Sequence, residues 1–86
     1  MHEMSIAMEV CSIAEAHVPR EQLTSVVEVG LEVGDQAGVE VDSLEFCLEV
    51  LLTSPPFGKA KPVIERVSGD VLRVSYLEVD DGRPDD

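Results

Sequence analysis

Residues 26–33 alternate between apolar side chains and a second set that is more polar on average, and this pattern constrains the fold more than any other in the chain. The set expected to face the core is Val27, Val29, Leu31 and Val33. The set expected on the other side is Val26, Glu28, Gly30 and Glu32. Strict alternation is typical of a strand with one buried face and one wetter face. We therefore predict a strand over residues 23–33, in a sheet with a single covered face.

Two segments have the apolar spacing of helices. Residues 4–18 repeat apolar side chains in two neighbouring rows, and Pro19 is expected to end this helix. The pattern of residues 42–53 predicts a second helix, with Asp42 and Glu45 forming a capping box. Its predicted buried row, widened by Phe46 and Val50, is Leu44, Cys47, Leu48 and Leu51.

Two further β-rich stretches, residues 61–67 and 71–79, complete the chain. Residues 68–70 are few enough for a hairpin turn, and Pro62 favours an edge position for the first of the two strands. The predicted strand, helix and strand over residues 23–67 are expected to form a right-handed crossover. The predicted fold is α+β and two-layered: a three-stranded sheet with both helices on one face, in the order α-β-α-β-β.

Length and charge limit the function. A chain of 86 residues forms one domain, and 18 acidic against 6 basic residues give a net charge of −12. This charge argues against nucleic acid and anionic membranes as partners and favours basic protein surfaces. We expect a cytoplasmic protein, because the first residues lack a basic leader and no apolar run could span a bilayer. Cys11 and Cys47 lie far apart among apolar neighbours, so we expect reduced core thiols.

The first three residues, Met1, His2 and Glu3, are the candidate metal site. The α-amine, the His2 imidazole and the amide nitrogens of His2 and Glu3 can form fused chelate rings around one ion. Four nitrogens in a plane suit Ni(II) or Cu(II) better than Zn(II). His17 is expected to interact with the end of its helix, with a second metal site as the alternative. No arrangement of residues resembles a catalytic site, so we do not expect an enzyme.

Four segments together resemble the HypA/HybF family of nickel-insertion factors for [NiFe]-hydrogenase maturation. They are residues 1–7 (MHEMSIA), 29–40, 44–51 and 73–79. The resemblance implies a HypA-like nickel-binding domain over residues 1–79. The composition of residues 80–86 predicts an acidic, frayed tail. The resemblance also implies nickel binding through the Met1 amine, the His2 imidazole and backbone nitrogens, Glu3 included. The implied partners are the [NiFe]-hydrogenase large subunit and the GTPase HypB, with urease as another client.

The sequence departs from this family where the family carries a zinc domain with two CxxC pairs between its last two strands. Residues 68–70 occupy that position, and no CxxC motif exists in the chain. A structural zinc site needs about four Cys or His ligands, so no structural zinc is expected. The alternative function is a metal-free interaction module that docks on a hydrogenase subunit or assembly factor. An exposed edge strand is compatible with a monomer or a weak dimer.

Overall fold

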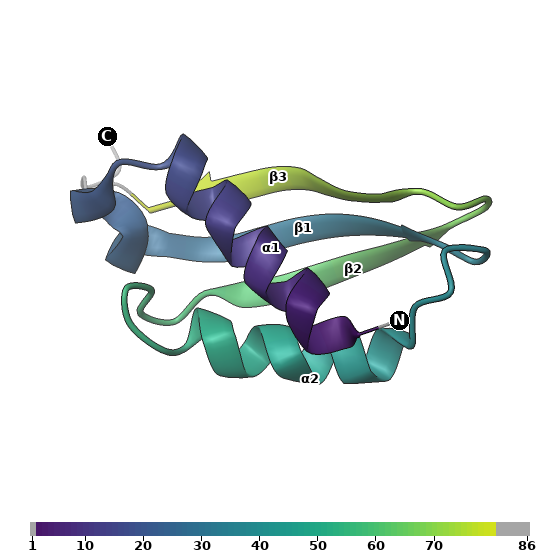
Figure 1. Ribbon diagram of the computed structural model, residues 1–86. Coiled ribbons are helices and arrows are strands. Elements are labelled where there is room, and N and C mark those ends of the chain that lie inside the picture. Colours follow the sequence, from purple (N-terminus) through teal and green to yellow (C-terminus); the bar gives the residue numbers. More distant parts are fainter. Residues whose placement is uncertain (1, 81–86) are drawn as a thin grey trace.

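The structure is a computed structural model that describes residues 2–80, and it has the predicted α+β architecture (Figure 1). Its elements are α1 (Glu3–His17), the 3₁₀-helix η1 (Arg20–Ser25), β1 (Val26–Gly34), α2 (Val41–Leu52), β2 (Lys61–Val67) and β3 (Leu72–Val79). The predicted order α-β-α-β-β is confirmed, with η1 as an additional short helix. Both α-helices lie over the same side of the sheet (Figure 1).

The sheet has the order β2-β1-β3, with β1 parallel to β2 and antiparallel to β3. The edge position predicted for the strand that contains Pro62 is confirmed. The predicted hairpin between β2 and β3 is wrong, because β1 lies between these strands. Residues 68–71 cross the end of β1 instead, and the Gly34 amide donates to the Val71 carbonyl at 2.6 Å. A Cβ at Gly34 would lie 2.2 Å from the Gly69 carbonyl oxygen, so this crossing requires glycine at position 34.

Aliphatic side chains fill the space between the sheet and the helices. The core residues from α1 are Ala7, Val10, Cys11 and Ala14; those from β1 are Val26, Val29, Leu31 and Val33; those from α2 are Leu44, Leu48 and Leu52. Burial of this apolar surface is the main favourable contribution to folding. It also fixes α1 against α2 and so determines where the first turn of α1 lies relative to the rest of the fold.

The prediction for the amino-terminal part of the first strand is wrong in two respects. Leu23 lies in η1, so β1 begins only at Val26. Val27 is an extra residue in the pairing with β3, because Val26 pairs with Val79 and Glu28 with Glu78. This β-bulge turns Val26 into the core and leaves Val27 exposed, the reverse of the predicted facing. From Val29 onwards the predicted core face is confirmed.

The start and the outer face of α2 also differ from prediction. The N-cap residue is Glu40 rather than Asp42, and among residues 2–80 no side chain of the predicted capping box caps this helix. Phe46 and Val50 do not widen the buried row, since 65% and 43% of their surfaces are exposed. The helix buries a narrower stripe because it covers only one margin of a three-stranded sheet.

The outer face of the sheet carries polar pairs between β1 and β3. The Tyr76 hydroxyl donates to the Glu28 carboxylate, an interaction that raises the pKa of Tyr76. The Tyr76 ring covers Gly30, where a Cβ would be only 2.0 Å from the ring. Arg73 Nε donates to Glu32 Oε1 at 2.6 Å. Polar side chains on an exposed sheet face are expected where helices cover only the other side.

Of the predicted tail over residues 80–86, only Asp80 is described, and its amide donates to the Ser25 carbonyl at 2.8 Å; residues 81–86 lie outside the described part. None of the helices within residues 2–80 combines the length and the apolar character that crossing a membrane requires.

Candidate metal centre

His2 stands immediately before α1 and has an extended backbone, with φ −89° and ψ 100°. The first bond of the helix runs from the Ile6 amide to the His2 carbonyl at 3.2 Å. The first N–H groups of any helix have no partner within the helix. The amide nitrogens of His2 and Glu3 can therefore lose their protons to a metal ion without breaking a helical hydrogen bond. The exposed His2 side chain is attached at the same point.

Glu3 ties this end of α1 to the start of α2. Its Oε2 accepts a hydrogen bond of 3.0 Å from the backbone amide of Glu40, the N-cap residue of α2. This bond is the main cause that holds the pKa of Glu3 below its ordinary value of 4.5. In the predicted capping box, the Glu45 carboxylate would accept a hydrogen bond from the N-cap amide. Glu3 of α1 takes this role instead. The backbone amide of Glu3 makes no hydrogen bond within the helix, so its nitrogen can act as a metal donor while the side chain is held by Glu40.

Side chains alone do not form a metal site in the described part of the chain. Within residues 2–80, no group of three or more His, Cys, Asp or Glu side chains is arranged to hold a metal ion. Cys11 and Cys47 are free thiols in this part of the chain. Burial, together with the nearby charge of Glu15, raises the pKa of Cys11 to about 11, so this thiol is protonated at neutral pH. Metal ligation requires the thiolate, which disfavours Cys11 as a donor.

His17 occupies the opposite end of α1 and is engaged locally. Its Nδ1 donates a hydrogen bond of 2.8 Å to the Ile13 carbonyl. This contact confirms the predicted interaction with the end of the helix. The neighbouring backbone groups at this end are carbonyls, as at the end of every helix. The structure therefore brings no second nitrogen donor set to His17 within the described residues.

The predicted site is thus described at His2 and Glu3, whereas Met1 lies outside the described residues. What the sequence reasoning missed is the contact between Glu3 and Glu40, 37 positions apart. No local motif encodes such a contact, since it depends on how α1 and α2 pack. The described arrangement offers one imidazole and two amide nitrogens outside the hydrogen bonds of the helix, a donor set suited to a planar site for Ni(II) or Cu(II).

Comparison with known proteins points to one family. Residues 1–73 match the family described as "Hydrogenase/urease nickel incorporation, metallochaperone, hypA". The chain is 42% identical over 69 residues to a hydrogenase maturation factor HypA from Azoarcus sp. (strain BH72). It is also 42% identical over 69 residues to one from Geobacter metallireducens. Each of these alignments covers 80% of this chain and 60% of the relative.

The similarity extends to a third relative and covers only part of the length of each relative. A hydrogenase maturation factor HypA from Streptomyces avermitilis is 40% identical over 70 residues, which are 80% of this chain and 53% of that protein. The chain thus spans only about three fifths of the length of the curated relatives that it matches. What those full proteins do as a whole is therefore not transferred to this chain by similarity alone.

Proposed function

Because the chain belongs to the HypA family of hydrogenase/urease nickel-incorporation metallochaperones, we propose that it binds Ni(II) as cargo at its amino terminus and delivers it for hydrogenase maturation. The family consists of metallochaperones rather than enzymes, and the prediction that the chain is not an enzyme is thereby confirmed. The proposed donors are the Met1 amine, the His2 imidazole and amide, and the Glu3 amide.

The observation that carries this proposal is the backbone at the start of α1. The amides of His2 and Glu3 precede the first helical hydrogen bond, which joins Ile6 to His2. Two deprotonated amides balance the charge of a divalent ion, so the chelate avoids repulsion from the positive end of the helix dipole. Because protons are released on binding, nickel affinity is expected to fall as the pH decreases. A carrier with this property binds nickel without a buried cage and can pass it to a site of higher affinity.

We further propose a recipient, an assisting partner and a cellular location for nickel delivery. We propose the [NiFe]-hydrogenase large subunit as the recipient, with the GTPase HypB as an assisting partner. We also propose that residues 1–79 form the nickel-binding domain, that residues 80–86 form an acidic tail, and that the protein works in the cytoplasm as a monomer or weak dimer. The absence of structural zinc stays a prediction; the segment between β2 and β3 offers no cysteine for it.

The test is a Ni(II) titration of the protein with an unblocked amino terminus, by calorimetry in competition with a chelator. The parent should bind one equivalent. Changes to outer-shell partners of a metal ligand cost roughly 10–100-fold in affinity, so loss of a ligand in His2→Ala should weaken binding by about 100-fold or more.

His17→Ala is the matched control, because it removes the other histidine from the same helix. It should leave nickel affinity within about twofold of the parent, as expected for distant, independent sites. If His2→Ala binds nickel as tightly as the parent, the proposal is wrong. The metal-free docking module then becomes the better interpretation of the chain.

A further inference from the structure

The outer face of α2 carries the largest exposed aromatic surface in the described part of the chain. Phe46 is one of only three aromatic residues in the sequence, and 65% of its surface is exposed. Val50, one helical turn later, is 43% exposed. Exposed apolar side chains that stand side by side mark interaction sites more often than scattered ones do. Neither residue contributes to the core that holds the fold together.

These two residues line a shallow groove of about 410 Å³ between α2 and the beginning of β2. The α2 wall is formed by Phe46, Glu49, Val50 and Thr53, and the opposite wall by residues 60–62. Phe46 and Val50 are four positions apart, so they follow one ridge of the helix surface. Such a ridge is complementary to the i, i+4 row of a second helix laid against it.

The charges around the groove define what such a helix must carry. Asp42 and Glu49 lie four residues before and three residues after Phe46, on the same stripe of α2, and Glu45 is adjacent. All three carboxylates belong to exposed residues. Lys61, on the opposite wall, is the single positive charge among the lining residues. The Phe46 ring is therefore bracketed by acidic groups along α2, and the complementary helix is apolar in the middle and basic before and after this point along its axis.

We propose that the α2 groove docks a basic amphipathic helix of a partner protein. An apolar side chain of that helix would rest against Phe46 and Val50, with Lys or Arg side chains near Asp42, Glu45 and Glu49. The chain itself does not supply this occupant. A second copy would bring another net charge of −12, and residues 80–86 contain four Asp and one Arg.

The inference does not rest on nickel binding, because His2 and Glu3, the described residues of the proposed metal site, take no part in lining the groove. A His2→Ala variant should bind the same partner helix with unchanged affinity. Failure of the nickel titration and failure of this docking test are thus separate results.

The test measures fluorescence anisotropy of a labelled Leu/Lys amphipathic helical peptide of about 18 residues, added to the full chain. A peptide of equal charge with scrambled order, and one with Glu in place of Lys, serve as probes of amphipathicity and of charge sign. The parent should bind the amphipathic basic peptide most tightly, with an affinity that falls as salt is added. Absence of this preference overturns the proposal.

The first variant is Phe46→Ala, compared with Val27→Ala, an exposed apolar residue outside the groove. Phe46→Ala should weaken peptide binding by at least about tenfold, as for the central aromatic residue of an interface. Val27→Ala should stay within about twofold. Unchanged circular dichroism and melting temperature establish that Phe46→Ala remains folded, as its exposure predicts. Equal affinities for parent and Phe46→Ala overturn the proposal.

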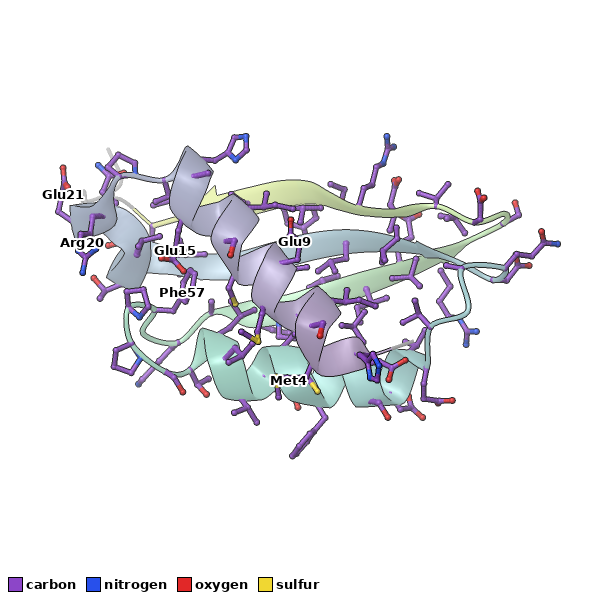
Figure 2. The ribbon with its side chains drawn as sticks, viewed as in Figure 1. Met4, Glu9, Glu15, Arg20, Glu21 and Phe57 are labelled. Carbon is purple, nitrogen blue, oxygen red and sulfur yellow. The ribbon has the colours of Figure 1, made fainter. Side chains whose placement is uncertain are left out.

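The second comparison separates local charge from net charge. The groove variant Asp42→Asn/Glu45→Gln/Glu49→Gln removes three carboxylates, and so does the control Glu9→Gln/Glu15→Gln/Glu21→Gln on α1 and η1 (Figure 2). The groove variant should lose about fivefold or more in affinity, and the control much less. Equal losses would mean non-specific attraction and overturn the proposal. Self-association of the parent in sedimentation, lost in Phe46→Ala, would also overturn it in favour of a second copy.

Discussion

The two ends of α1 carry the only two histidines of the chain, and they differ in what surrounds the ring. At the amino end, His2 precedes backbone amides that have no partner within the helix. At the carboxyl end, the His17 ring donates to the Ile13 carbonyl, and the Val18 amide caps the helix through Ala14. Both histidines are exposed, so exposure does not distinguish them.

The difference lies in the polarity of the helix. Amide nitrogens that lose a proton are strong donors for Ni(II), whereas backbone carbonyls suit harder cations such as Ca²⁺ and Mg²⁺. A histidine before a helix therefore gains nitrogen partners from the backbone, and a histidine in the last turn gains oxygen acceptors. The same side chain thus has a proposed metal-binding role at one end and a structural role at the other.

The largest expected effect is on the core on which α1 rests. Leu48 of α2 is fully buried, and Leu48→Ala should cost about 2–5 kcal/mol of unfolding free energy in urea titrations. Val50→Ala on the same helix, at an exposed position, should stay within about 0.5 kcal/mol. Nickel affinity of the folded Leu48→Ala protein should remain within about twofold, because the donors are local. A large loss of affinity would show that the site depends on the packing of the whole domain.

The next largest effect is expected from blocking the α-amine. Acetylation of the amino terminus removes one proposed donor and leaves both histidines intact. Nickel affinity should fall by about 100-fold or more, beyond the usual cost of an outer-shell change. Calorimetry of acetylated and free protein measures this difference. Equal nickel affinities for the acetylated and the free protein would contradict the proposed metal-binding role of the amino end of α1.

A smaller, pH-dependent effect is expected at Glu3. The Glu40 amide holds the pKa of Glu3 below 4.5 in the folded protein. The carboxylate therefore stabilises the fold above its unfolded pKa, and this stabilisation is lost as the pH falls through the lower folded pKa. Parent and Glu3→Gln should differ in unfolding free energy at pH 7 and converge in acid. A difference that persists unchanged once Glu3 is protonated in acid would contradict this assignment.

The smallest effect is expected at the other end of the helix. His17→Ala removes the bond to the Ile13 carbonyl, which is worth about 0.5–1.5 kcal/mol at most for a typical hydrogen bond and less at an exposed position. Chemical denaturation should detect a small loss of stability. A loss comparable to that of Leu48→Ala would mean that His17 has a larger structural role than its single contact indicates.

Patterns that depend on neighbouring residues were predictable from the sequence. The helical spacing of residues 4–18 and the proline after it predicted the bounds of α1 to within one residue at each end. The alternation from Val29 to Val33 gave the core face of β1. The candidate site was equally local, because it consists of the first residues and their backbone nitrogens.

Features that depend on distant partners were not predictable. Val27 is displaced by a bulge whose register is set by β3, and β2 and β3 are separated by β1 rather than paired in a hairpin. Phe46 has an apolar side chain at helical spacing but lies outside the core, so the spacing alone predicted the wrong face. The Glu3 carboxylate replaces a local capping box because the packing of α1 brings it to Glu40.

The most direct test of the account is the electronic state of nickel bound to the protein with a free amino terminus. Four nitrogens in a plane should give a low-spin, diamagnetic Ni(II) centre. The NMR signals of the protein should then stay sharp, with small shifts confined to the surroundings of His2. Shifted and broadened signals, as from a paramagnetic six-coordinate ion, or changes centred on His17 rather than His2, would contradict it.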